Sequence, residues 1–184
     1  MKTFALVFLA LLGLGSGCGW AATSLAVTVD PATGGPGKFA AEEIHREAAA
    51  RGLVVGAPDD PAPGAAIRIA LSVGPAAGAA PTPQSYGLRV QRTNGRTTVS
   101  VRGADAAGAM YGGLDVAEAI RTGTLKSLRD SDHAPHLAQR GIKFNLPLDL
   151  RTPTYTDPSD AAQANIPEMW SMAFWRELFD DMAR

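Results

Sequence analysis

The chain has 184 residues, a formal net charge of −1 and no block of like charge. Because 17 Lys and Arg residues are balanced by 18 Asp and Glu residues, there is no basic stripe for nucleic acid, which is not an expected partner. Cysteine occurs once, at Cys18, so disulfides within the chain play no part in the fold. The length is enough for one domain that is held together by a buried core.

The first residues have the parts of a secretory signal peptide. A lysine precedes an apolar run from Phe4 to Leu12, and small residues follow. This run is shorter than the about 20 apolar residues that a membrane-spanning helix needs, and we expect no membrane span in the later chain. Small residues near Ala21 predict cleavage after it, and hence a periplasmic or extracellular protein. A lipid-anchored protein that starts at Cys18 is the alternative, because Gly-Ser-Gly precedes that cysteine as in a lipobox.

The first half of the mature chain alternates strand and helix patterns. Apolar residues at period two predict strands, and apolar residues three or four apart predict helices. In chain order these patterns predict a strand over 25–29, a helix over 38–51, a short strand over 53–55 and a strand over 67–73. The glycine-rich segment from Gly34 to Gly37 is expected to form a turn, and the segment 74–83, rich in Ala, Gly and Pro, a surface connection.

A β-hairpin followed by a helix is the clearest local signal. Alternating apolar residues flank Asn94-Gly95, a pair that adopts the positive φ angles of a type I′ turn. Asp105 then predicts the N-cap of an amphipathic helix that ends before Gly123. Without the short strand over 53–55, the order is β-α-β-β-β-α, which predicts an α+β domain over residues 22–123.

A second unit is expected after a polar linker over 124–139. Alternation over 141–146 predicts a strand, and the proline-rich stretch 147–167 predicts a loop. Ser171 predicts the cap of a last helix, whose apolar stripe comprises Phe174, Trp175, Leu178, Phe179 and Met182. Residues 140–184 thus contain one βα unit of a TIM barrel, and one unit cannot close a barrel. The uncovered stripe predicts a missing partner surface and a chain that is the front end of something longer.

Three segments resemble a known family in sequence. They are Gln84 to Val90 (QSYGLRV), Gly103 to Gly112 (GADAAGAMYG) and Arg140 to Pro147 (RGIKFNLP). Their order resembles that of secreted glycoside hydrolases of the β-N-acetylhexosaminidase and α-glucuronidase type. The resemblance implies a zincin-like N-terminal domain followed by the start of a catalytic TIM barrel, and it covers the chain from about Leu25 onward.

This resemblance implies the N-terminal portion of a secreted glycoside hydrolase that acts on polysaccharide-derived sugars. In such enzymes the catalytic carboxylates lie on later barrel strands, so we expect none of them in this chain and expect the chain alone to be inactive. The carbohydrate substrate would bind through the missing barrel. The alternative is a secreted carbohydrate-binding or interaction module without enzymatic activity, in which Trp170 and Trp175 contact a sugar or a partner.

Arg140 is the main candidate for substrate binding. The resemblance implies that it contacts sugar hydroxyls from the first barrel strand, a task that suits the fixed donors of a guanidinium. An ion pair at the domain junction is the alternative role. Asn145 and Asp149 are weaker candidates, because they lie where that strand runs into its loop and also suit a turn.

Metal and nucleophile chemistry find no support in the sequence. Glycoside hydrolysis needs two carboxyl groups across the scissile bond, but each acid near the expected barrel mouth lacks an assignable partner. His45, His133 and His136 lack the i, i+4 spacing of zinc proteases, and His45 is expected to be a solvated surface residue. No Gly-x-Ser-x-Gly motif or phosphate-binding loop occurs. We therefore expect neither a metal nor a cofactor.

Overall fold

A mixed sheet forms the centre of the fold. The computed structural model describes residues 23–56, 64–74, 82–141 and 171–184. Within them the sheet has six strands in the order β2-β1-β3-β5-β4-β6. The strands are β1 (Ser24–Val29), β2 (Val54–Val55), β3 (Ile67–Val73), β4 (Tyr86–Thr93), β5 (Arg96–Gly103) and β6 (Ser131–His133). Strands β2, β1, β3 and β5 run parallel, and β4 is antiparallel to both β5 and β6.

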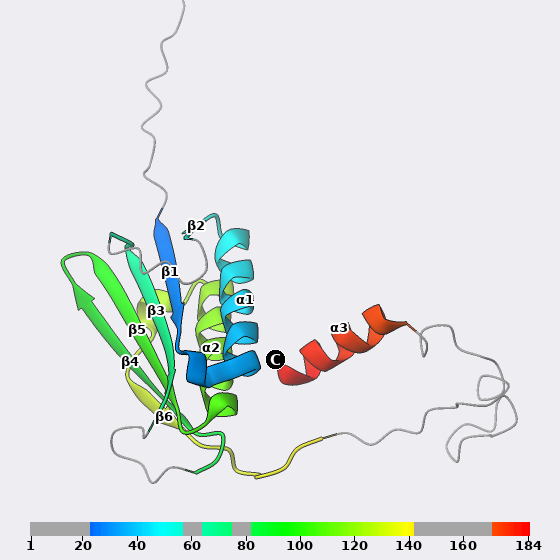
Figure 1. The fold of residues 1–184 in the computed structure, drawn as a ribbon. Coiled ribbons are helices and arrows are strands. Elements are labelled where there is room, and N and C mark those ends of the chain that lie inside the picture. Colours follow the sequence, from blue (N-terminus) through cyan, green and yellow to red (C-terminus); the bar gives the residue numbers. More distant parts are fainter. Residues whose placement is uncertain (1–22, 57–63, 75–81, 142–170) are drawn as a thin grey trace, which may run out of the picture.

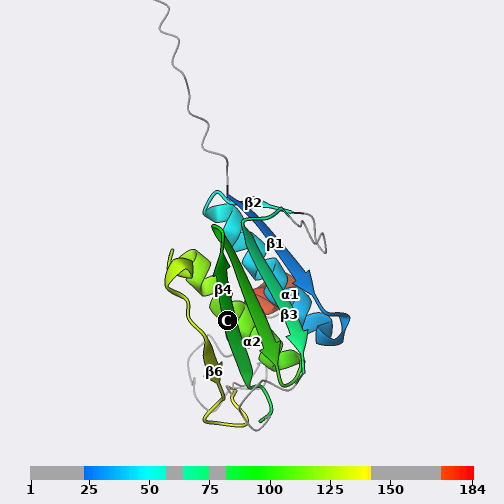
Figure 2. The ribbon, with the colours of Figure 1, turned by 90° about the vertical axis from the view of Figure 1, so that its left-hand side faces the viewer.

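Two helices cover one face of this sheet. They are α1 (Gly34–Ala50), which follows a 3₁₀ turn η1 (Pro31–Thr33), and α2 (Ala106–Arg121), which precedes a 3₁₀ turn η2 (Leu125–Ser127). Figure 1 shows α1 and α2 side by side against the sheet, and Figure 2 shows the opposite face, which no described element covers. The described part of residues 24–133 is therefore a two-layer α/β arrangement.

The core lies between the sheet and the two helices. Alternate strand residues that face the helices are buried, among them Val27, Leu71 and Val101, whereas their neighbours face the other side. Ile44 of α1 and Val116 of α2 close the core from the helical layer. Each large aliphatic side chain buried in this way contributes roughly 1.5–3 kcal/mol. The period-two pattern of the sequence thus corresponds to one buried and one open face of the sheet.

The predicted hairpin and the predicted helix after it are confirmed. Asn94 and Gly95 have φ angles of 52° and 75°, as a type I′ turn requires. Asp105 caps α2, since its Oδ1 accepts a hydrogen bond of 2.8 Å from the backbone N–H of Gly108. A Cβ atom on Gly108 would lie 2.2 Å from the carbonyl oxygen of Ser85, so only glycine allows α2 to approach the sheet this closely here.

The prediction of a turn at Gly34 to Gly37 is wrong, because these residues form the first turn of α1. Proline at position 36 is compatible with this turn, where a backbone N–H has no partner within the helix. Gly37 is needed for packing rather than for a turn, because a Cβ atom there would lie 2.0 Å from Oγ1 of the buried Thr33. The helix therefore begins four residues before the predicted start.

The predicted linker over 124–139 is also wrong in part, since it contributes η2 and the edge strand β6. Side chains rather than a periodic pattern hold this segment. Arg89 donates to the backbone oxygen of Ser131 at 3.0 Å and pairs with Asp132 at 2.8 Å, while Asp130 accepts from the backbone N–H of Val90 at 2.8 Å. These contacts protect the edge of β4 and extend the sheet past the predicted domain end.

The last helix, α3 (Met172–Ala183), begins where the sequence predicts. Oγ of Ser171 accepts a hydrogen bond of 3.3 Å from the backbone N–H of Phe174. None of the residues of α3 is buried, and Met172 and Phe179 are 65% and 56% exposed. Figure 1 shows α3 on the far side of α1 and α2 from the sheet. Arg184, which directly follows α3, forms an ion pair of 2.8 Å with Glu43 of α1.

The described fold is a mixed α/β domain. Its zincin-like character, the start of a TIM barrel and the division of the chain into two units stay predictions. The signal peptide, the loop over 147–167, and all but the first residue of the strand predicted over 141–146 lie outside the described residues. No described helix combines the length and the hydropathy needed to cross a bilayer.

Candidate functional site

Arg140 lies at a corner of the α/β domain, where the chain leaves the sheet. Its guanidinium donates a hydrogen bond of 2.7 Å to Oε1 of Gln84 and one of 3.2 Å to the backbone oxygen of Leu137. The same group lies 5.3 Å from the ring centroid of Tyr111, within the range of a cation–π interaction. Arg140 is thus oriented by an amide and an aromatic ring, whereas the sequence had suggested an ion pair as the alternative role.

Gln84 is itself held in place by its neighbours. It has a positive φ of 65°, uncommon for a residue other than glycine. Its backbone N–H donates to Oδ2 of Asp105 at 2.8 Å, and its side-chain N–H donates to the backbone oxygen of Ala138 at 3.2 Å. Asp105 therefore serves two purposes, since its other oxygen caps α2. The corner is built by fixed contacts rather than by loose surface side chains.

An open cavity of about 660 Å³ lies at this corner. Gln84, Tyr111 and Arg140 line one part of it, and Met182 of α3 lines another. The remaining N–H groups of Arg140 could donate to adjacent hydroxyl or carboxylate oxygens there. Of the three predicted substrate-binding residues the structure describes Arg140 alone, because Asn145 and Asp149 lie outside the described residues.

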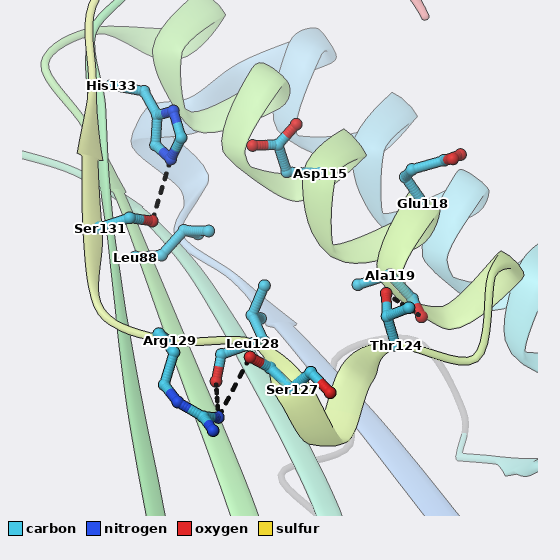
Figure 3. Close-up of a pocket in the computed structure, with 10 residues that line it drawn as sticks. All are labelled: Leu88, Asp115, Glu118, Ala119, Thr124, Ser127, Leu128, Arg129, Ser131 and His133. Atoms are coloured by element: carbon cyan, nitrogen blue, oxygen red, sulfur yellow. Dashed lines mark hydrogen bonds between the residues drawn. The ribbon is translucent and has the colours of Figure 1, made fainter.

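A second cavity, of about 440 Å³, lies between α2, η2 and β6 (Figure 3). Its lining includes two carboxylates, one imidazole and several hydroxyls, contributed by Asp115, Glu118, His133, Thr124, Ser127 and Ser131. Both carboxylates are engaged: Asp115 accepts a hydrogen bond from the hydroxyl of Tyr86, and Glu118 pairs with Arg121 at 2.5 Å. They are therefore not a free acid and base pair of the kind that glycoside hydrolysis requires.

Tyr86 links the sheet to this second cavity. Its ring stacks on the ring of His133 with 4.8 Å between the centroids, and its hydroxyl donates to Asp115. Burial, followed by the hydrogen bond to Asp115 and the charge of that carboxylate, raises the pKa of Tyr86 well above its ordinary value. Tyr86 thus stays a neutral donor at physiological pH and holds β4 to α2.

Ser131 and His133 form the one arrangement in this cavity that resembles a nucleophile and a base. Nε2 of His133 lies 2.9 Å from Oγ of Ser131. Both residues lie on the same short strand, His133 is exposed, and the nearby carboxylate of Asp115 is used by Tyr86. The pair therefore lacks the orienting acid of a catalytic triad. Nothing in the local pattern of the sequence predicted that Tyr86, Asp115 and His133 would meet.

The expectation that His45 is a solvated surface residue is wrong. The side chain is partly buried, and its Nε2 is buried without a hydrogen-bond partner. Burial lowers the pKa of His45, and the nearby carboxylate of Glu42 opposes that shift. The residue packs against the protein as a neutral ring. Among the described residues, no group of three or more His, Cys, Asp or Glu side chains gathers in a way that could hold a metal ion.

Comparison with known proteins finds a likeness among solved structures. No protein family and no curated protein matches the sequence. Among solved structures, the chain is similar to a GH138 enzyme that targets pectin rhamnogalacturonan II, with a TM-score of 0.49 and 15% sequence identity. The similarity covers 62% of this chain and 16% of that chain, so this chain spans about a sixth of that enzyme's length.

Proposed function

We propose that this chain is the N-terminal portion of a secreted glycoside hydrolase that acts on polysaccharide-derived sugars. In this proposal, the signal peptide exports the protein to the periplasm or the cell exterior. The zincin-like α/β domain supports a barrel that starts near Arg140, and the catalytic carboxylates lie on segments outside this chain.

The observation that carries the proposal is the meeting of three separate sequence segments at one corner. The segments that resemble glycoside hydrolases contain Gln84, Asp105 with Tyr111, and Arg140. These residues contact one another through hydrogen bonds of 2.8 and 2.7 Å and through the guanidinium over the ring. The three segments that resemble glycoside hydrolases in sequence thus contact one another at the point where the chain leaves the α/β domain.

The exposed α3 adds physical support. Met172, Phe179 and Met182 are 65%, 56% and 48% exposed. A short helix in water is marginal unless its apolar face packs on another surface, and an exposed stripe of this kind marks a missing partner. Further barrel units would supply that partner.

Under this proposal, Arg140 is held in an orientation that lets it bind a sugar. Tyr111 and Gln84 fix the plane of the guanidinium, while the cavity beside it leaves donors open to a ligand. Asn145 and Asp149 are proposed as additional contacts on the segment that follows.

The test is to express the whole reading frame that contains these residues and, separately, this chain alone. Both would be assayed with chromogenic β-N-acetylhexosaminides and glucuronides. We expect hydrolysis by the longer protein and none by the chain alone. In the longer protein, Arg140→Gln should lower kcat/KM about tenfold or more, because a charged hydrogen bond to the substrate is lost. Arg121→Gln, an equal change of charge on the exposed end of α2, is the matched control.

Two outcomes would contradict the proposal. Hydrolysis by the chain alone would show that its carboxylates suffice. A reading frame that stops after Arg184, with oligosaccharide binding by the chain, would support the carbohydrate-binding or interaction module instead.

A further inference from the structure

The face of the sheet opposite α1 and α2 is turned toward the viewer in Figure 2, and the strand register places a row of polar residues on it. The register of the strands determines which residues share this face, since side chains alternate along a strand. Arg68, Thr98 and Gln91 are direct neighbours across β3, β5 and β4. Two residues further along, Ala70, Ser100 and Arg89 form the next row, and Ser72 and Arg102 belong to the one after it. We call the described residues of these rows, together with Arg96, the open face.

The open face is strongly basic although the whole chain is not. The described strands place four arginines on it, Arg68, Arg89, Arg96 and Arg102, against one acid, Asp132, which pairs with Arg89. The whole chain has a net charge of −1. Positive charge is thus concentrated on the side of the sheet that no described helix covers.

Strand β5 supplies the centre of this surface. Its open side presents Arg96, Thr98, Ser100 and Arg102 in turn, so a guanidinium stands at each end and two hydroxyls stand between them. Arg96 and Arg102 are six residues apart, so their Cα atoms are separated by about 20 Å at roughly 3.4 Å per residue. Within the part of the chain that the structure describes, no hydrogen bond or ion pair engages the guanidinium of Arg96 or of Arg102, and both residues are exposed.

Two shallow hollows lie on the open face. One, of about 440 Å³, lies among Arg68, Gln91 and Arg96. The other, of about 250 Å³, lies over the short side chains of Ala26 and Ala70, beside Arg68. The open face is therefore uneven: donors surround depressions that could take the ring of a bound group.

We propose that the open face binds an anionic polysaccharide, with uronate carboxylates as the groups that Arg96 and Arg102 recognise. A guanidinium holds a carboxylate through two parallel hydrogen bonds. The hydroxyls of Thr98 and Ser100, with the amide of Gln91, match the many hydroxyls of a sugar chain. An extended polymer would lie along β5 and contact both Arg96 and Arg102.

The chemistry of the face favours a polysaccharide over a single-stranded nucleic acid. Proteins that bind single strands combine basic grooves with aromatic side chains on which bases stack. The described residues of the open face include no aromatic side chain. The proposed binding also goes beyond the proposed hydrolase function, because it requires neither a barrel nor catalysis.

The experiment is a calorimetric titration of the exported chain with galacturonate oligomers at low ionic strength. The same oligomers with methyl-esterified carboxyl groups serve as the uncharged ligand. The test variant is the double substitution Arg96→Gln with Arg102→Gln. The matched control is Arg121→Gln with Lys126→Gln, which removes the same charge from exposed positions at the end of α2 and in η2.

We expect the free oligomers to bind, the esterified oligomers to bind far more weakly, and added salt to reduce the affinity. The test variant should raise Kd by about ten- to a hundredfold, because two charged hydrogen-bonding groups are lost. The control should change it little. The Kd of Arg96→Lys with Arg102→Lys should lie between those of the test and control variants. Lysine keeps the positive charge but cannot form the two parallel hydrogen bonds of a guanidinium. Far-UV circular dichroism would establish that every variant is folded.

The proposal is overturned if the chain does not bind the free oligomers. It is also overturned if esterification changes nothing, or if the test and control variants lose affinity equally. A DNA oligomer that binds as tightly as the uronate would assign the face to another class of polyanion. Each result stands apart from the hydrolase assay, because it is measured on the chain without catalysis.

Discussion

Helices α2 and α3 begin in the same way and lie in different surroundings. Both have a capping side chain at the N-terminus, Asp105 in α2 and Ser171 in α3, and both have an apolar stripe. Eight residues of α2 are buried against the sheet and α1, whereas no residue of α3 is buried. Local sequence is thus enough to specify a helix, but the stability of that helix depends on a surface that a local pattern does not describe.

The comparison is tested most strongly by truncating one large apolar side chain to alanine in each of the two regions. Leu71 is 1% exposed in the core, whereas Phe179 of α3 is 56% exposed. Leu71→Ala should lower the free energy of unfolding by about 2–5 kcal/mol, through lost burial and a cavity. Phe179→Ala should change it by less than about 0.5 kcal/mol. Urea unfolding followed by circular dichroism measures both, and similar losses would show that α3 packs on the domain after all.

A glycine substitution tests how closely α2 approaches the sheet. Gly108→Ala places a Cβ atom 2.2 Å from a backbone oxygen that cannot easily move. We expect a loss of roughly 1–3 kcal/mol from overpacking, read as a lower thermal midpoint. Gly35→Ala in α1 is the matched control, because nothing lies within 4 Å of its added Cβ atom. The control should be neutral or slightly stabilising, and a loss at Gly35 equal to that at Gly108 would refute the steric explanation.

The two N-caps offer a finer comparison. Asp105→Ala removes the acceptor for Gly108 and also the acceptor for Gln84. It should cost about 1–2 kcal/mol in the unfolding of the α/β domain. Ser171→Ala should leave that unfolding unchanged and reduce only the helical signal of α3. An unchanged midpoint in Asp105→Ala would mean that neither hydrogen bond contributes to stability.

The smallest expected effect concerns His45. Burial lowers its pKa below the ordinary value of 6.5, so the folded protein binds this proton less readily than the unfolded chain. Stability that is complete above that value should therefore decrease as the pH falls below it. His45→Leu should flatten the stability profile between about pH 5 and 7. His136→Leu, at an exposed position, is the control, and an unchanged slope in His45→Leu would contradict this assignment.

Much of the fold could be predicted from local patterns. Asn94-Gly95 fixes the hairpin, and Asp105 and Ser171 fix two helix starts, because each acts on residues a few positions away. Strand β6 could not be predicted in this way. It is held by Arg89 and Asp130, which act across about 40 positions of the chain. The start of α1 was missed because glycine and proline are usually turn residues. In α1, Pro36 suits the first helical turn, and the close contact with Thr33 requires glycine at position 37.

In the candidate site, too, local patterns identify single residues but not the contacts between distant parts of the chain. Arg140 was identified from the sequence, but its partner Gln84 is 56 residues away, and no spacing rule connects them. The stack of Tyr86 on His133 joins β4 to a segment that was expected to be a linker. The open face is visible only when the strand register is known, because its arginines come from three strands.

Hydrogen exchange measured by mass spectrometry on the intact chain tests the central claim most directly. That claim is that the α/β domain is complete in itself, while α3 needs a further body to pack on. We predict slow exchange for the amides of β1, β3, β5, α1 and α2, and exchange for α3 as fast as for an unstructured peptide. Protection of α3 equal to that of α2 in a monomer would contradict the claim, and would remove the physical support that α3 gives to the proposed hydrolase.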